Sequence, residues 1–239
     1  MQAGASSEIL TSTHFCLAND TSRPVQDRLQ SIRKLIELCA TTEAITVADA
    51  MATDATLDIQ DRVNALGILS KIEGANQKAI SGYEKIMETL NNSPSIKGYE
   101  KLSYLFEIGI GLHTAGSVDK GLTILLNSFK ALTRGIDARD LISISTISAV
   151  AATEISFNAG ILGDRATAIA LLRWAVYTPL SGAFLQEAII LGAEVAERMR
   201  ELTLSREFLE HFKKFGKEVE RFKDRAEALE AKLLAGTAS

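Results

Sequence analysis

The sequence predicts an all-α fold: an α–α superhelix of antiparallel helix pairs that ends in a long C-terminal helix. The first observation is composition, because 46% hydrophobic residues are accompanied by only 3 prolines and 6% aromatics, which favours helices over strands. The second is that apolar residues recur at helical spacing, without the alternation and hairpin signals typical of strands. The third is a spacing rule that three stretches of the chain share.

The spacing rule joins an aliphatic residue and a small neighbour to a glycine seven positions later. A small residue follows after five more positions, and a larger one after another four. Small residues in both helices and a glycine in the turn allow two antiparallel helices to approach closely. The three sets are Leu66-Gly67, Gly74, Ala79 and Tyr83; Ile108-Gly109, Gly116, Gly121 and Leu125; and Ile155-Ser156, Gly163, Ala168 and Leu172.

The elements follow in order along the chain. Residues 1–24 are rich in Ser, Thr and Asn, and we expect a flexible N-terminal segment. Residues 25–239 are expected to form a single helical-repeat domain, whose degenerate first pair resembles the caps of repeat arrays. The repeat-like pairs are expected at about residues 25–52, 59–90, 96–133, 138–177 and 183–234.

The stretch Leu141–Gly163 has Glu154 as its only charge and is as long as a membrane span. Its many Ser and Thr residues are too polar for a span, so we expect a central helix with neighbours on both sides. We therefore predict a soluble protein without a membrane span.

The C-terminal segment, about 205–234, is expected to be one long charged helix with a heptad seam. Its apolar residues recur at steps of four and three: Phe208, Phe212, Phe215, Val219, Phe222, Ala226, Leu229 and Leu233. One interpretation is a helix that caps the solenoid. The other is a homodimer formed through the far half of the seam, by Val219, Phe222, Leu229 and Leu233.

The spacing rule resembles the tetratricopeptide repeat over about residues 59–178. That family carries an aliphatic–small doublet in its first helix, a turn glycine and an early alanine in its second. A fourth candidate begins with Leu191-Gly192 but has Met199 at the turn position. Tetratricopeptide repeats are 34 residues long, whereas the turn glycines here stand 42 and 47 positions apart. A HEAT-like or another α–α solenoid therefore stays open.

The resemblance also implies a concave groove lined by first-helix residues. The matching positions are Asn64, Ile68, Lys71, Phe106, Ile110, His113, Thr153, Phe157 and Ile161. Because Ile and Phe dominate this set, the groove would suit the apolar face of a partner helix or peptide. The alternative is that these apolar side chains belong to the core.

Motifs that carry chemistry are absent from the sequence. Three scattered histidines have no second ligand at metal spacing, and no phosphate-binding, nucleophile-elbow or zinc-protease motif occurs. A net charge of −4 and a pI near 5.5 argue against a nucleic-acid partner. We expect no cofactor and no metal, and hence a non-catalytic protein–protein adaptor or assembly scaffold. The alternatives are a regulatory or sensor helical domain, or an enzyme on an unfamiliar helical scaffold.

Cys16 and Cys39 have neither disulfide-framework nor CxxC spacing, so we expect two reduced thiols. The first residues lack the basic start and apolar run of a secretory signal peptide. These features favour a reducing compartment such as the cytoplasm, or an organelle reached with a targeting segment that is later removed.

Overall fold

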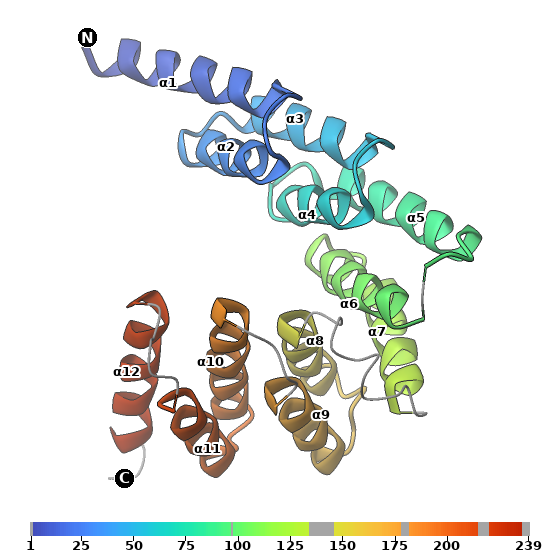
Figure 1. Cartoon of the computed structure of the whole chain (residues 1–239), viewed down its shortest axis with the longest axis vertical. Coiled ribbons are helices and arrows are strands. Elements are labelled where there is room, and N and C mark those ends of the chain that lie inside the picture. Colours follow the sequence, from blue (N-terminus) through green and yellow to red (C-terminus); the bar gives the residue numbers. More distant parts are fainter. Residues whose placement is uncertain (1, 97, 134–145, 178–181, 215–219, 236–239) are drawn as a thin grey trace. The chain divides into compact units, whose positions relative to one another are not determined.

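The computed structural model describes residues 2–96, 98–133, 146–177, 182–214 and 220–235. All regular structure in these ranges is α-helical, which confirms the expected all-α class (Figure 1). None of the described helices is long and apolar enough to cross a membrane. In chain order the helices are α1 (Gln2–Asn19), α2 (Val25–Glu37), α3 (Thr41–Thr53), α4 (Ile59–Leu69), α5 (Asn76–Asn92), α6 (Gly98–Thr114), α7 (Val118–Thr133), α8 (Thr146–Asn158), α9 (Arg165–Tyr177), α10 (Gly182–Arg198), α11 (Leu202–Phe212) and α12 (Glu220–Ala235).

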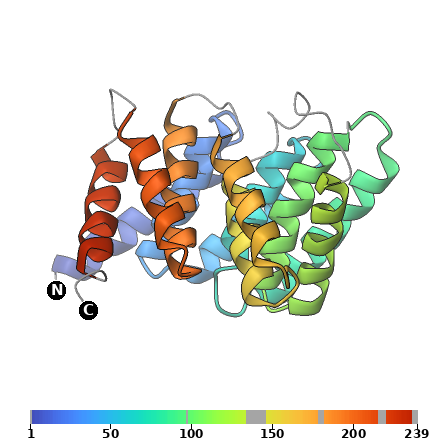
Figure 2. The ribbon, with the colours of Figure 1, turned by 90° about the horizontal axis from the view of Figure 1, so that it is seen from below.

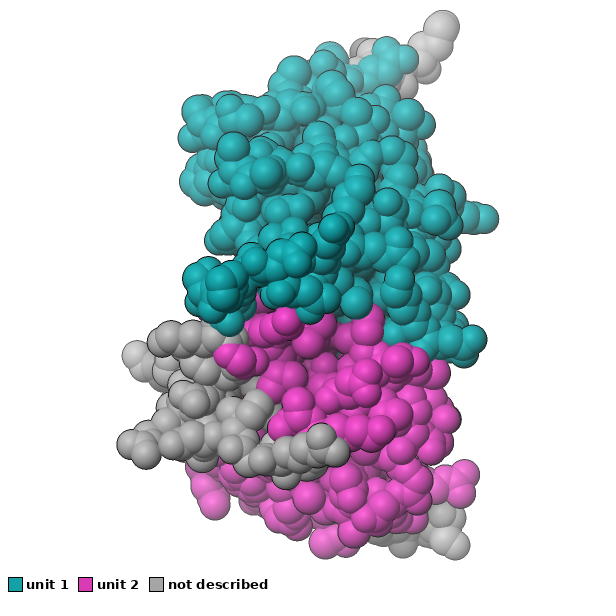
Figure 3. Space-filling view, turned by 90° about the vertical axis from the view of Figure 1, so that its right-hand side faces the viewer, with its two compact units in different colours: residues 1–96, 107–121 teal, residues 97–106, 122–239 magenta. Residues whose placement is uncertain are grey.

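The chain divides into two compact units, which Figure 3 distinguishes by colour. Unit 1 contains Met1–Ile96 and Glu107–Gly121, and unit 2 contains Lys97–Phe106 and Leu122–Ser239. The division crosses α6 and α7, so each of these helices contributes one part to each unit.

Among α1 to α5 each helix packs on its successor, and α1, α2 and α3 also pack on the helix after that. Contacts of α1 with α3 and of α3 with α5 make one layer, and contacts of α2 with α4 begin a second layer. The core between the layers is formed by fully buried side chains such as Leu29, Leu66 and Tyr83. Consecutive helix pairs therefore stack as the apolar spacing predicts.

Unit 2 repeats this packing around α10, which contacts α8, α9, α11 and α12. Figures 1 and 2 both show α11 and α12 side by side. The aromatic side chains Phe208, Phe212 and Phe222 are at most 1% exposed. At roughly 1.5–3 kcal/mol for each fully buried aromatic side chain, this burial is a large part of what holds the last helices together.

Left-handed residues reverse the chain within five helix hairpins along the sequence. Three are glycines, Gly74, Gly116 and Gly160, and two are Cys39 and Arg200, whose φ values are 58° and 61°. Glycine adopts this conformation without steric cost, whereas a residue with a Cβ is strained there. The turn at Gly74 and the turn at Gly116 agree with the spacing rule.

The third turn corrects that rule, because Gly160 rather than Gly163 is left-handed. Helix α8 ends at Asn158, and the amide of Ile161 already donates to the carbonyl of Ser156 at 2.9 Å. This bond closes a Schellman motif, so the reversal is complete before Gly163. The fifth turn uses Arg200, next to the Met199 that the rule placed there.

Close approach of α6 and α7 explains the small residues of the second set. A methyl group on Gly121 would lie 2.6 Å from the Gly109 carbonyl oxygen and 2.7 Å from the His113 nitrogen. Both are backbone atoms of α6, so the two helices touch main chain to main chain. The expectation that small residues permit such an approach is confirmed at this hairpin.

The first 24 residues differ from the flexible segment that their composition predicts. They contain α1, which packs on α2 and α3. Arg28 is only 6% exposed, and its Nε donates to the carbonyl of Ala18 near the end of α1 at 3.0 Å. Tertiary packing and this bond hold a helix whose sequence lacks a clear amphipathic pattern.

The same connector occurs again 34 positions later. Asp20 accepts hydrogen bonds from the amide and hydroxyl of Ser22 at 3.0 and 2.6 Å, and Asp54 accepts the equivalent pair from Thr56 at 2.9 and 2.7 Å. Arg62 Nε donates to the carbonyl of Ala52 at 3.1 Å, as Arg28 does to Ala18. The segment from α1 to α2 and the segment from α3 to α4 are thus built alike.

The C-terminal segment forms two helices instead of the one long helix that we predicted. Helix α11 ends at Phe212 and α12 begins at Glu220, and α12 packs on both α10 and α11. Folding back buries the apolar sides of both helices within one chain, which one continuous helix could not do.

The predicted self-association seam lies in and before α12. Phe222, Leu229 and Leu233 are 1%, 7% and 3% exposed, so they do not form the open surface that the heptad spacing led us to expect. Phe215 and Val219 lie outside the described residues. The remaining seam supports the interpretation of α12 as a cap.

Charged side chains connect alternate helices within each unit. In unit 1, Asp49 pairs with Lys78 and Glu84 with Lys120. Exposed pairs of this kind contribute only about 0–1 kcal/mol each, so they fix the register of neighbouring hairpins more than they stabilise the fold. The pairs in unit 2 are Glu154–Arg198, Arg165–Glu201, Arg173–Glu207, Glu194–Arg225 and Glu197–Lys232.

Candidate functional site

The candidate site in unit 1 is the surface of α4 and α6 that carries five of the predicted groove residues. We call it the α4–α6 face, and it comprises Asn64 and Ile68 on α4, Lys71 in the turn after α4, Ile110 and His113 on α6, and the bridging residues Gln60 and Glu107. Asn64, Ile110 and His113 are half-buried and Lys71 is exposed. Ile68 is only 7% exposed and belongs to the core rather than to an open groove.

A polar bridge fixes α4 against α6. Gln60 Nε2 donates to Glu107 Oε2 at 2.7 Å and to Asn64 Oδ1 at 3.4 Å. Because Gln60 Nε2 donates to Asn64 Oδ1, the oxygen of the Asn64 amide points toward Gln60 and its nitrogen is directed away from Gln60. The face therefore offers an oriented amide donor, an aliphatic side chain and a lysine within one short stretch.

Tyr83 supports this face from beneath. It comes from α5, is 1% exposed, and its hydroxyl lies where a methyl group on Gly111 would overlap it. A methyl group on Gly67 would be 4.0 Å from the same hydroxyl. Burial raises the pKa of Tyr83 well above its ordinary value, and the Glu107 carboxylate raises that pKa further. The ring is thus a neutral spacer between α4 and α6.

The other four predicted groove residues lie in unit 2. Phe106 is fully buried and packs edge-to-face on Phe129, with ring centroids 5.3 Å apart. Thr153 is 1% exposed, and its hydroxyl donates to the Ala149 carbonyl at 2.8 Å. Both are core residues, so their assignment to a groove is wrong. Phe157 and Ile161 are half-buried and stay accessible in part.

The nine predicted positions therefore do not form one described groove. Five are brought together on the α4–α6 face, and four belong to a unit that is described separately. The groove dominated by Ile and Phe is also replaced by a mixed surface, because Phe106 and Ile68 are in the core.

Sequence reasoning missed Gln60, Glu107 and the role of Tyr83. A signal for Gln60 existed, because the run Gln26-Asp27-Arg28 recurs as Gln60-Asp61-Arg62 at the 34-residue offset. No such signal marks Glu107, whose contact with Gln60 joins residues 47 positions apart.

Within the described ranges, no three His, Cys, Asp or Glu side chains are grouped so that they could hold a metal ion. Cys16 and Cys39 are free, exposed thiols. The chain matches no known protein-family model, and no curated protein or solved structure is significantly similar to it.

Proposed function

We propose that this chain is a non-catalytic protein-binding adaptor or assembly scaffold, and that a segment of a partner protein lies across the α4–α6 face of unit 1. The observation that carries the proposal is the face itself. Half-buried Asn64, Ile110 and His113 lie on two helices that Gln60 and Glu107 bridge, and exposed Lys71 lies in the turn that follows α4. A fixed surface of mixed polarity suits a peptide or helix, because binding then costs little reorganisation of the protein.

The tetratricopeptide-like assignment is part of this proposal. It is supported by the 34-residue offset between the Asp20–Arg28 and Asp54–Arg62 connectors, which equals that family's period. Helical arrays of this kind commonly serve as binding surfaces, because stacked hairpins present a continuous row of helices.

The partner segment would be amphipathic. Ile110 supplies the apolar contact, the free amide hydrogens of Asn64 can donate to a main-chain carbonyl, and Lys71 can pair with an acidic side chain at the edge. This differs from the apolar groove that the sequence predicts, and it requires fewer large hydrophobic anchors on the partner.

The proposal is tested by capture of proteins from an extract of the native source by wild-type protein and by Ile110→Glu. We expect Ile110→Glu to lose specific partners while its circular dichroism and melting temperature stay close to those of the wild type, because Ile110 is only half-buried. Ile9→Glu is the matched control, since Ile9 is 67% exposed on α1, away from the α4–α6 face.

If Ile110→Glu has a much lower melting temperature than the wild type, Lys71→Glu tests the face instead, because the exposed Lys71 side chain tolerates substitution. A folded Ile110→Glu or Lys71→Glu protein that captures the same partners as the wild type would show that the face does not bind them.

A further inference from the structure

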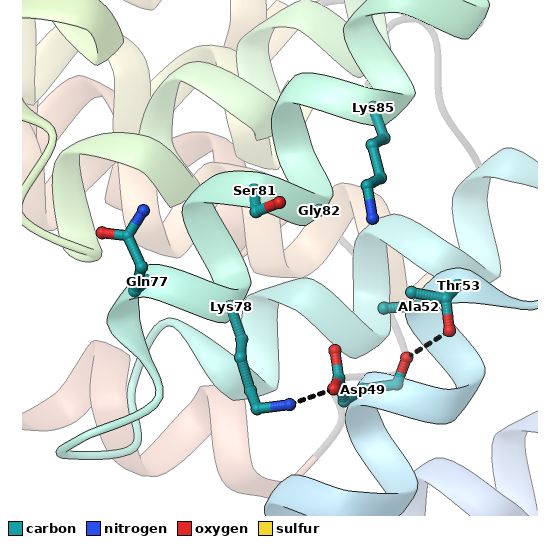
Figure 4. A pocket seen from close by; sticks show the side chains of 8 residues that line it. All are labelled: Asp49, Ala52, Thr53, Gln77, Lys78, Ser81, Gly82 and Lys85. Carbon is teal, nitrogen blue, oxygen red and sulfur yellow. Dashed lines mark hydrogen bonds and ion pairs between the residues drawn. The ribbon is translucent and has the colours of Figure 1, made fainter.

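A hollow of about 350 Å³ lies between α3 and α5 in unit 1 (Figure 4). It is in the layer formed by α1, α3 and α5, not on the α4–α6 face. Its lining is Asp49, Ala52 and Thr53 from α3, and Gln77, Lys78, Ser81, Gly82 and Lys85 from α5.

The hollow exists because the side chains are small where α3 meets α5; each of these is the second helix of its hairpin. The short side chains of Ala52 and Ser81 leave the space open. The corresponding helices of unit 2, α9 and α11, bring the Tyr177 ring against His211, with centroids 4.8 Å apart. Aromatic side chains fill that seam, whereas the seam between α3 and α5 stays accessible.

The charges around the hollow are not balanced. Asp49 and Lys78 form an ion pair across it, and the Thr53 hydroxyl donates to the Asp49 carbonyl at 2.8 Å. Lys85 is exposed, and its ammonium group has no ion pair or hydrogen bond with any residue that the structure describes. The adjacent acid, Glu84, is engaged by Lys120 at 2.6 Å. The lining therefore carries one uncompensated positive charge on a protein of net charge −4.

We propose that this hollow receives an acidic side chain, Glu or Asp, from a protein partner. The carboxylate pairs with Lys85, and the Ser81 hydroxyl, one turn earlier on α5, supplies a neutral donor beside it. The space is at the lower end of the range for ligand sites and is open, so it suits one side chain on a peptide rather than an enclosed cofactor. The proposal is independent of the α4–α6 face.

The test is a titration of ¹⁵N-labelled full-length protein with the blocked peptide hexaglutamate, followed by amide chemical shifts at low salt. We expect saturable shifts confined to residues 49–53 and 77–85. Hexaglutamine, which has the same length without charge, should cause none. Lys85→Glu should bind hexaglutamate about tenfold more weakly, because it replaces an attraction by a repulsion.

Arg33→Glu is the matched control, since it reverses an exposed charge on α2, outside both the hollow and the α4–α6 face, and should leave hexaglutamate binding unchanged. Shifts elsewhere only, or equal binding by Lys85→Glu, would overturn the proposal. Equal shifts with inorganic phosphate at the same concentration would also overturn it, in favour of a site for small anions. Ile110→Glu should still bind hexaglutamate, so failure of the adaptor surface and failure of this hollow give different results.

Discussion

Replacing Gly121 by alanine tests the main-chain contact between α6 and α7 in unit 1. The new methyl group would lie 2.6 and 2.7 Å from two backbone atoms of α6, where ordinary contacts begin at 3.4 Å. Because backbone cannot rotate away, α7 must move outward by several tenths of an ångström, and the packing between the helices is loosened.

Two opposing contributions set the magnitude. Alanine favours a helix over glycine by about 1 kcal/mol, whereas overpacking costs about 1–3 kcal/mol. Since the obstacle at Gly121 is rigid, we take the upper end of that range and expect a net loss of about 2 kcal/mol in the free energy of unfolding. For a chain of this size, the melting temperature should fall by about 4–8 °C.

Two other glycines are controls in the same thermal melts followed by circular dichroism. Neither Gly98 nor Gly116 has an atom within 4 Å of a new methyl group, but Gly116 has φ of +90°. Gly98→Ala should be neutral or slightly stabilising, and Gly116→Ala should lose about 1 kcal/mol through backbone strain alone. If Gly121→Ala has the same melting temperature as Gly98→Ala, α6 and α7 do not touch through their main chains and the reasoning is refuted.

Three further predictions concern a connector and the last helix. Hydrogen bonds from Thr56 hold the pKa of Asp54 below its usual 3.8. The ionised carboxylate therefore stabilises the fold above that pH, and this stabilisation is lost as the pH falls. Urea midpoints measured from pH 6 to pH 2.5 should drop less in Asp54→Asn than in the wild type. Leu229→Glu buries an unpaired carboxylate and should cost at least about 3 kcal/mol without a new oligomeric state; unchanged melting with altered light scattering would restore the seam as a contact between copies. Arg225 binds Glu194 through two hydrogen bonds of 2.9 and 2.7 Å, so Arg225→Ala should speed amide hydrogen exchange in α12 alone. Exchange in α12 at the wild-type rate would show that this ion pair does not hold the helix.

The helices from α4 to α9 could be located from the sequence, because Gly, Pro or Asn residues stand near their C-terminal ends. The flanking elements could not. Helix α1 owes its order to Arg28 and to packing on α2 and α3, which no local pattern in residues 2–19 reveals. At the other end, α11 and α12 share one heptad seam, and the same spacing describes either one helix or two that fold together.

The candidate site shows a different limit. The spacing of first-helix residues correctly identified positions on α4 and α6, but it could not separate lining from core. Ile68 and Ile110 occupy matching positions in the two helices, yet one is buried and the other half-buried. That difference depends on neighbours far away in sequence, as does the bond between Gln60 and Glu107.

Arg28 and Arg62 fix the length of the connectors that precede α2 and α4. Arg28 and Arg62 each reach back ten residues to a helix-end carbonyl, so the length of chain between the two helices is fixed by a covalent path and a hydrogen bond together. One residue inserted after Asp54 would move Thr56 out of the position two residues on, from which its amide and hydroxyl donate to Asp54. Insertions that ordinary surface loops tolerate should therefore destabilise the fold here. Side-chain hydrogen bonds, and not loop length alone, set the spacing of the first hairpins.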